Sequence, residues 1–311
     1  MNELDVLKAT PHIAAHHWWE WQIPVYLFLG GIAAGLMVLT SLRVLREPDG
    51  ARSATFRLLT WLAPLVLSLG MVALWLDLER RWHVPRFYMA LQPKAPMSWG
   101  AWILLAVYPL VLLFALGELP ERLRGRLGAR LRHLAEWADR PATKRRLAWG
   151  NVLVGAALGL YTGILLSTMS ARPLWSSSVL GPLFLVSGLS TAAALMLLFR
   201  IEGGERHVLS RLDLGLILLE MALLAILFLG LMTGGETQQR AGRLLLGGPY
   251  TAAFFSIVVS AGLLVPLIAE VWEIRGNGGS RWFVPALILI GGFALRWILV
   301  SAGQTSGWQA L

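Results

Sequence analysis

The chain has 311 residues, of which 56% are hydrophobic and 14% charged. A soluble domain normally carries about 25% charged residues, so this composition excludes an ordinary soluble protein and indicates an integral membrane protein. The formal net charge is +9. Basic residues of membrane proteins gather in cytoplasmic loops, so we expect no nucleic-acid partner. The absence of cysteine excludes disulfides, thiolate-bound iron–sulfur clusters and a thiol nucleophile.

Eight apolar runs are long enough to cross the ~30 Å hydrocarbon core of a bilayer as helices. They cover residues 22–40, 58–78, 99–116, 147–168, 179–199, 214–233, 250–272 and 282–302. The predicted fold is an all-α integral membrane protein, a bundle of eight transmembrane helices in one domain over residues 1–311. The first run lacks a basic segment ahead of it and is followed by charged Arg43, Arg46 and Glu47. We therefore expect a retained helix and not a cleaved signal peptide.

The distribution of basic residues predicts the orientation. An even number of spans puts both termini on one side, where the loops hold eight Lys and Arg residues, against eighteen on the other side. The positive-inside rule then predicts periplasmic termini in a bacterial inner membrane. The longest basic loop, residues 119–146, faces the cytoplasm in this orientation. Its sequence fits either a short amphipathic helix lying on anionic lipid or a dedicated partner surface.

Small residues recur at four-residue spacing in two of the runs. Gly31 and Gly35 lie in the first run, and Gly155, Gly159 and Gly163 lie in the fourth. This spacing allows close helix packing, and it also fits the alternative that the missing side chains leave room for a flat ligand.

Histidine placement limits the redox chemistry that the spans support. All six histidines fall outside the spans, at positions 12, 16, 17, 83, 133 and 207. A transmembrane cytochrome b ligates haem through His pairs within its helices, so we expect no haem and no metal centre in the membrane. Redox chemistry in this protein would require a diffusible cofactor such as quinone.

Ionisable residues inside the spans are candidates for function, because burying them is costly. Glu220 lies within the sixth span, one heptad after Asp213, and Arg296 lies within the eighth. A proton relay and a structural ion pair both fit these residues. Asp77, Glu118 and Glu270 lie at span ends, where solvation is easier. Asp77 stands out because it is on the predicted outer side, beside His83.

Aromatic residues mark the outer half of the predicted bundle. Trp21 ends the segment HHWWEW at residues 16–21, which reads either as an interfacial aromatic belt or, through His16 or His17, as the mouth of a quinone pocket. Tyr26 and Tyr161 are the tyrosines that fall inside spans in the outer half. A phenol donates a hydrogen bond to a quinone carbonyl while its ring packs on apolar neighbours.

Five segments in order resemble the membrane subunit of polysulfide reductase, the NrfD/PsrC-like family. They are IPVYLFLGGIAAG from Ile23, PRFYMALQPKAPMSWGAWIL from Pro85, YTGILLS from Tyr161, RPLW from Arg172 followed by LFLVSGLSTAAA, and GGFALRWILVSAGQ from Gly291. The resemblance covers nearly the whole chain. It implies an eight-helix subunit that binds menaquinone or ubiquinone and docks a ferredoxin-like subunit with four iron–sulfur clusters. That subunit in turn carries a catalytic subunit, often a molybdopterin enzyme.

The resemblance also assigns roles to particular residues. The quinone-pocket tyrosine of the family falls on Tyr161, and the proton-path arginine falls on Arg296. A His found in the first helix of some members falls on Tyr26, which is a departure in residue type. We expect the iron–sulfur subunit to be held by the outer loops, whose candidate contacts are Arg81, His83, Arg86, Arg172 and Trp175. The competing hypotheses are a proton-coupled transporter, with a path through Asp213, Glu220 and Arg296, and a passive membrane anchor.

Overall fold

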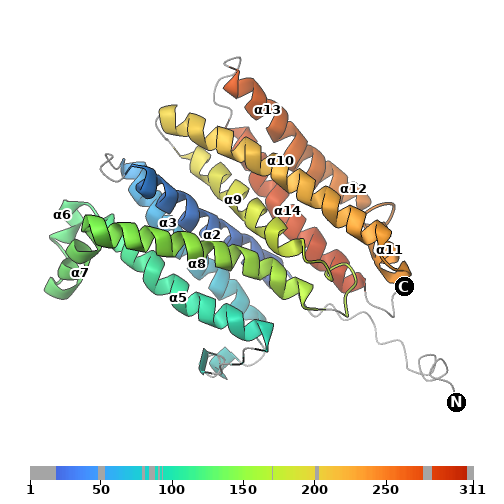
Figure 1. Cartoon of the computed structure of the whole chain (residues 1–311), viewed down its shortest axis with the longest axis horizontal. Helices are drawn as coiled ribbons and strands as arrows, with labels where there is room; N and C mark the ends of the chain where they lie inside the picture. The colour runs from blue at the N-terminus through green and yellow to red at the C-terminus, as the bar shows by residue number, and fades with distance from the viewer. Residues whose placement is uncertain are drawn as a thin grey trace.

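The computed structural model describes residues 19–47, 53–78, 81–83, 88–89, 92, 94–169, 171–199, 203–275 and 282–306. Its long helices are α2 (Gln22–Arg46), α3 (Ala54–Asp77), α5 (Pro96–Gly117), α8 (Pro141–Ser167), α9 (Leu180–Leu198), α10 (Gly203–Thr233) and α14 (Phe283–Thr305). The shorter ones are η1 (Arg81–His83), α6 (Glu121–Arg124), α7 (Ala129–Asp139), α11 (Glu236–Arg243), α12 (Thr251–Ala253), η2 (Phe254–Leu264) and α13 (Val265–Ile274). All elements in the described ranges are helical, and they run side by side as a bundle (Figure 1).

The prediction of eight membrane-spanning helices is confirmed. Each predicted run coincides, to within one residue at either end, with part or all of a helix, or of the continuous α12–η2–α13 stretch, that is long and apolar enough to cross a bilayer. Several helices extend beyond the apolar run at their basic ends. The 31 residues of α10 reach about 45 Å at 1.5 Å per residue, which is longer than the ~30 Å hydrocarbon core. At these basic ends the predicted bounds fell short, because hydropathy marks the apolar run whereas backbone hydrogen bonding continues past it.

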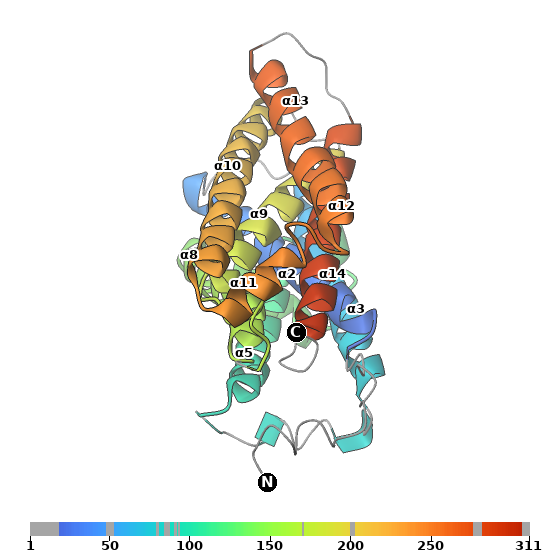
Figure 2. The ribbon, with the colours of Figure 1, turned by 90° about the vertical axis from the view of Figure 1, so that its right-hand side faces the viewer.

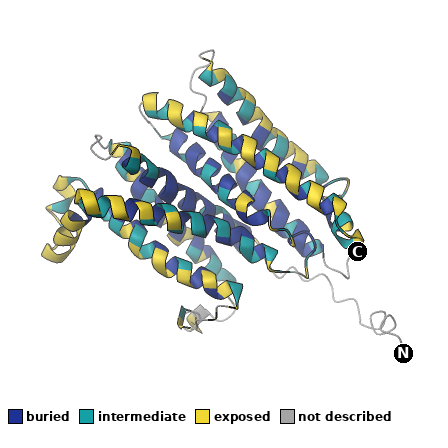
Figure 3. Cartoon of the chain, viewed as in Figure 1, coloured by how far each residue is buried: buried dark blue, intermediate teal, exposed yellow. Residues whose placement is uncertain are grey.

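The centre of the bundle is formed by α2, which packs against α3, α8, α9 and α14. Buried residues gather on α2, α9 and α14, whereas α5 and α10 expose broad outer faces (Figure 3). In the view of Figure 2, α10, α11 and the α12–α13 stretch flank α9 and α14. A helix that exposes apolar residues on its outer face fits a lipid environment.

Glycine ridges bring the central helices into backbone contact. A Cβ atom at Gly35 would lie 2.5 Å from the carbonyl oxygen of Gly188 and 2.5 Å from the Cβ of Ala192. Gly155 packs in the same way on Ala34 and Met37 of α2. At these positions the structure favours tight packing over space for a flat ligand.

The two ends of the described chain meet at one end of the bundle, as an even number of spans requires. The backbone N–H of Trp19 donates to Oε1 of Gln304 at 2.9 Å, and Nε2 of Gln304 donates to the carbonyl of Trp19 at 2.9 Å. The α6–α7 hairpin lies at the opposite end (Figure 1).

Candidate functional site

A cavity of about 770 Å³ lies between α2, α3, α5 and α8. Its walls are mainly apolar, and its ionisable groups are three phenols, one carboxyl group and one imidazole. The lining residues are Tyr26, Met71, Val72, Leu74, Trp75, Asp77, Leu78, His83, Tyr88, Met97, Gly100, Ala101, Leu104, Tyr161 and Leu165. A large apolar cavity with a few convergent polar groups is the usual form of a small-molecule site.

Both predicted span tyrosines reach this cavity. Tyr26 lies on α2 and Tyr161 on α8, and each side chain is only 5% exposed. The Tyr161 hydroxyl lies against Gly100, within reach of the Gly100 backbone. A Cβ atom at position 100 would overlap the Tyr161 ring. The sequence PMSWGAW therefore matters locally, because its glycine leaves the space that the phenol occupies.

The other predicted site residues divide between the cavity and its surroundings. Asp77, the last residue of α3, and His83, in η1, both line the cavity. Trp21 does not line it, since its ring lies elsewhere and is 47% exposed. His17 lies outside the described residues.

Tyr88 also lines the cavity, although the sequence patterns did not indicate it. It lies in the loop segment between the second and third spans, outside any apolar run, so neither periodicity nor the cost of burial marked it. Partial burial, together with the neighbouring Tyr108, raises the pKa of the Tyr88 phenol. The phenol therefore stays a hydrogen-bond donor throughout the physiological pH range.

Arg296 is fully buried at the centre of the bundle. Its NH1 donates to the Ser187 hydroxyl at 3.1 Å and to the Gly292 carbonyl at 2.8 Å, and its NH2 donates to the Phe184 carbonyl at 3.4 Å. The guanidinium also faces the ring of Phe184, with 5.4 Å between Cζ and the ring centroid. Gly31 of α2 provides the space for it, because a Cβ there would lie 2.8 Å from NH2.

Glu220, on α10, lies close to the buried Arg296. Its side chain is 3% exposed and lines a cavity of about 10 Å³ together with Ser187, Thr191 and Gly262. Such a volume is at the lower limit for one water molecule. Because Ser187 lies beside both Glu220 and Arg296, its hydroxyl joins the carboxyl group to the guanidinium.

Asp213, one heptad before Glu220 on α10, forms a second buried cluster with Glu270 of α13. Oδ1 of Asp213 accepts a hydrogen bond from Ser190 at 2.6 Å, and the carboxyl group of Glu270 lies beside that of Asp213. The expectation that Glu270 is solvated at a span end was wrong, because its side chain is only 2% exposed. Toward the bundle end, Arg206 approaches Glu270 and is ion-paired to Glu273 at 3.1 Å.

The two groups lie one heptad apart along α10 and together form a polar row in the apolar bundle, with Ser190 and Glu270 beside Asp213 and with Ser187 and Arg296 beside Glu220. Apart from Glu118, which is ion-paired with Lys144, the buried charged side chains of the described residues are one guanidinium, that of Arg296, and the three carboxyl groups of Asp213, Glu220 and Glu270. Arg206 is already matched by Glu273, so charge neutrality of the row requires protons on carboxyl groups. The row can therefore hold protons at several points.

The predicted interface residues differ in their accessibility. His83 is exposed, and NH1 of Arg172 donates to the backbone carbonyl of Gln304. Trp175 is 2% exposed, stacks on Trp19 with ring centroids 5.2 Å apart and donates to the Leu299 carbonyl at 2.8 Å. A buried ring offers no contact surface, so Trp175 supports its loop from inside. Arg86 and the side chain of Arg81 lie outside the described part of the protein.

Across the described residues, no group of three or more His, Asp or Glu side chains is arranged to hold a metal ion. Glu118 at the end of α5 is also buried, but it is ion-paired with Lys144 at 2.7 Å.

Comparison with known proteins gives matches over almost the full length. The profile of the family "Polysulphide reductase, NrfD" matches residues 10–306. A polysulfide reductase chain of Wolinella succinogenes is 32% identical over 306 residues, covering 92% of this protein and 94% of the relative. Protein NrfD of Escherichia coli is 30% identical over 310 residues, covering 92% of this protein and 95% of the relative. A tetrathionate reductase subunit of Salmonella typhimurium is 29% identical over 197 residues, covering 63% and 53%.

Proposed function

Because this chain belongs to the NrfD family of polysulphide reductase proteins, we propose that it is the quinone-binding membrane subunit of a respiratory oxidoreductase complex. It exchanges electrons between the quinone pool and an iron–sulfur partner subunit. Relatives named as parts of polysulfide and tetrathionate reductases support the assignment to a multi-subunit reductase. The terminal chemistry belongs to another subunit.

The observation that carries this proposal is the convergence of Tyr26 and Tyr161 on one apolar cavity. The donor set suits a quinone, because carbonyl oxygens accept hydrogen bonds from phenols and a flat ring packs on apolar walls. Gly100 has no side chain, and the Tyr161 phenol occupies the space where a Cβ atom would lie. Tyr26 takes the position of the family's first-helix histidine and keeps the ability to donate a hydrogen bond.

Bound quinone would supply two-electron chemistry coupled to two protons. In this protein, Tyr161, Tyr26 and Tyr88 orient the carbonyl groups, and the apolar wall excludes water. Asp77 and His83 line the same cavity, where a carboxyl group and an imidazole can pass protons between the cavity and the adjoining aqueous side.

Proton movement through the bundle is the second part of the proposal. The row from Glu270 and Asp213 through Glu220 and Ser187 to Arg296 offers carriers at successive depths. Arg296 also faces the ring of Phe28 on α2, with Cζ 5.8 Å from the centroid. Phe28 and Tyr26 lie two residues apart and so point to nearly opposite faces of α2, which places this helix between the row and the cavity. A proton-coupled transporter would use the same row without a quinone.

The orientation follows from the positive-inside rule. The cavity lies toward the end where Trp19 meets Gln304, and we propose that this end faces the periplasm of a bacterial inner membrane. The iron–sulfur subunit, with four clusters, would dock there on the loops at residues 79–97 and 169–178, through His83 and Arg172. It would carry a molybdopterin catalytic subunit.

The deciding experiment is purification of the tagged protein from its native host in mild detergent. Co-purifying subunits, iron, molybdenum and extractable menaquinone or ubiquinone are measured together. Quinone and an iron–sulfur subunit are the expected result. If crosslinked cells also show the protein alone, without quinone, the quinone function is overturned, and proton-dependent solute uptake by the protein in liposomes would favour a transporter.

A further inference from the structure

The α6–α7 hairpin encloses two adjoining cavities of opposite character. One, of about 1050 Å³, lies between the hairpin, α3 and α5 and is almost wholly apolar. The other, of about 590 Å³, is polar and lies between the hairpin and the start of α8. Arg57, Leu119 and Pro120 line both cavities, so the two meet there. We call this pair of cavities the hairpin groove.

The hairpin is held rigidly enough to define the groove. The Asp139 carboxylate accepts hydrogen bonds from Arg124 at 2.8 Å and from Lys144 at 3.0 Å. Lys144 also forms an ion pair with Glu118 at 2.7 Å. NH2 of Arg124 donates to the Gly117 carbonyl at 2.6 Å. Gly117 lies directly against Ala138, so α7 packs on the end of α5 without intervening side chains.

The apolar part of the groove presents side chains that a soluble surface would hide. Leu58, Leu112, Leu123 and Leu131 line it, and each is between 44% and 53% exposed. They come from different elements, so they form the walls of one hollow. In a chain that spans a membrane, such a hollow at the end of the spans adjoins the lipid acyl chains.

Cations exceed carboxylates around the groove. Its lining includes Arg57, Arg122, Arg124, Arg126 and Lys144, against Glu118, Glu121 and Asp139. Arg124 and Lys144 are neutralised by Asp139 and Glu118. Within the described residues, no carboxylate lies within 4.0 Å of the guanidinium groups of Arg57, Arg122 or Arg126. Their charge remains available to an anion.

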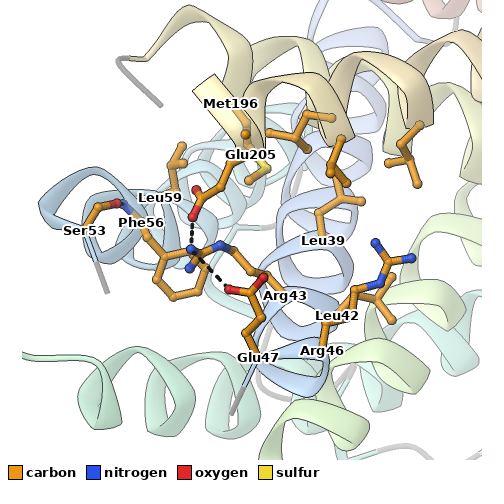
Figure 4. A pocket seen from close by; sticks show the side chains of 14 residues that line it. Leu39, Leu42, Arg43, Arg46, Glu47, Ser53, Phe56, Leu59, Met196 and Glu205 are labelled. Atoms are coloured by element: carbon orange, nitrogen blue, oxygen red, sulfur yellow. Dashed lines mark hydrogen bonds and ion pairs between the residues drawn. The ribbon is translucent and has the colours of Figure 1, made fainter. Parts of the chain in front are cut away.

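The Arg43 pocket on the same side of the bundle shows the opposite arrangement. It lies between α2, α3 and α10, and its central cation, Arg43, is ion-paired with Glu205 and Glu47 and lies over the Phe56 ring (Figure 4). Acidic residues of the protein already neutralise that charge. An excess of cations beside an apolar hollow therefore distinguishes the hairpin groove.

We propose that the hairpin groove binds one phospholipid with an anionic headgroup. Its acyl chains fill the hollow lined by Leu58, Leu112 and Leu131, and its phosphodiester lies at the junction, against Arg57 and Arg126. An amphiphile is the chemistry that matches an apolar cavity joined to a cationic one, and the basic side of a membrane protein faces an anionic leaflet. The lipid adds contacts between the hairpin and the bundle to the ion pairs that the protein itself makes there.

The test measures lipid retained by the purified complex. The complex is delipidated in detergent, incubated with dioleoyl phosphatidylglycerol or dioleoyl phosphatidylcholine, and analysed by native mass spectrometry. Arg57→Gln/Arg126→Gln should lower phosphatidylglycerol retention about tenfold, since charge-assisted hydrogen bonds are lost. Arg57→Lys/Arg126→Lys should restore most of it. Arg130→Gln/Arg132→Gln removes the same charge from the hairpin outside the groove and should leave retention unchanged.

Photo-crosslinking from position 131 identifies the occupant independently. A crosslinked phospholipid supports the proposal. Equal retention of both lipids, or an equal loss in the Arg130→Gln/Arg132→Gln control, would overturn it. So would a crosslink to another subunit or a second copy of this protein in place of lipid. The retention signal does not depend on quinone or on electron transfer, so failure of the proposed function would leave this test intact.

Discussion

Trp19 and Gln304 exchange two hydrogen bonds of 2.9 Å, although 285 residues separate them in the sequence. The amide of Gln304 matches the backbone N–H and C=O of Trp19 as another peptide unit would. The Trp19 ring stacks on Trp175, so the pair joins three separate segments at one end of the bundle.

Replacing Gln304 by Leu should destabilise the protein by about 1–3 kcal/mol, because two partly buried hydrogen bonds are lost at about 0.5–1.5 kcal/mol each. Thermal unfolding in detergent measures the loss. Gln92→Leu is the matched control, since the Gln92 side chain is exposed. Equal melting temperatures for the two variants would show that the pair contributes nothing to stability.

Tyr161→Phe should weaken quinone binding by about 2- to 10-fold while leaving the complex assembled, since one neutral hydrogen bond is removed. Gly100→Ala should have at least the same effect, because its new methyl group meets the Tyr161 ring. Quinone titration of the purified complex measures both. Gly215→Ala is the control, since a Cβ there contacts nothing. Unchanged quinone affinity in Tyr161→Phe would remove this residue from the pocket.

Glu220→Gln keeps the shape of the side chain but removes a proton carrier from the polar row. We expect fewer protons taken up per electron when the complex works in liposomes, at an unchanged level of assembly. Glu236→Gln, on the exposed face of α11, controls for loss of a carboxylate. An unchanged proton ratio would assign Glu220 a structural role.

Arg296→Met should destabilise the bundle by about 3–5 kcal/mol, because it leaves the buried carboxyl groups without their central cation. Adding Glu220→Gln should recover part of this loss, since the remaining acid is then neutral. Melting temperatures of the wild type, the two single variants and the double variant give a double-mutant cycle, which measures the interaction between the two residues. Additive effects would show that Arg296 and Glu220 do not interact.

The stability of the protein should depend on pH through Asp139, which lies in the hairpin outside the membrane-spanning helices. Burial alone would raise the pKa of its carboxyl group, but the hydrogen bonds and charges of Arg124 and Lys144 outweigh it and hold the pKa below its ordinary value. The stabilisation is therefore complete above the unfolded-state value and is lost as pH falls through the lower folded value. Asp139→Asn should destabilise by no more than about 1 kcal/mol at pH 7, since the group is partly exposed. The difference should shrink in melts at about pH 3.

The number and place of the spans could be predicted because crossing the hydrocarbon core requires about 20 apolar residues whatever their neighbours. The depth of Tyr26 and Tyr161 followed from span direction, and the structure brings both to one cavity. The contact between Gly100 and Tyr161 is tertiary, and no local pattern encodes it. Likewise, Trp175 reads as an exposed loop residue until α14 is seen to cover it.

Glu270 shows where reasoning from the position in a span fails: it lies near the end of the 250–272 run, where solvation was expected, but contact with Asp213 of α10 buries it. Counting helical turns would not have found this contact either. Counting at 3.6 residues per turn assumes an unbroken α-helix, but residues Phe254–Leu264 form a π-helix with i→i+5 bonding ahead of it. Pro266 follows directly in α13, where its missing N–H removes one α-helical bond. The direction in which every later side chain points is therefore shifted relative to a regular α-helix, and this tertiary position of Glu270 is not encoded in its place along the apolar run.

The π-helix therefore determines how α13 is rotated about its own axis, and so which of its side chains face α10. Each hydrogen bond of the π-helix spans one residue more than an α-helical bond, so the length of this segment decides which face of α13 meets α10. Removing a single residue from it would turn the following helix by about 100° without altering one side chain of the acidic cluster. The pairing of Glu270 with Asp213 is thus determined by backbone winding up to sixteen residues earlier, and homologues that differ by one residue in this helix should have separated these two acids.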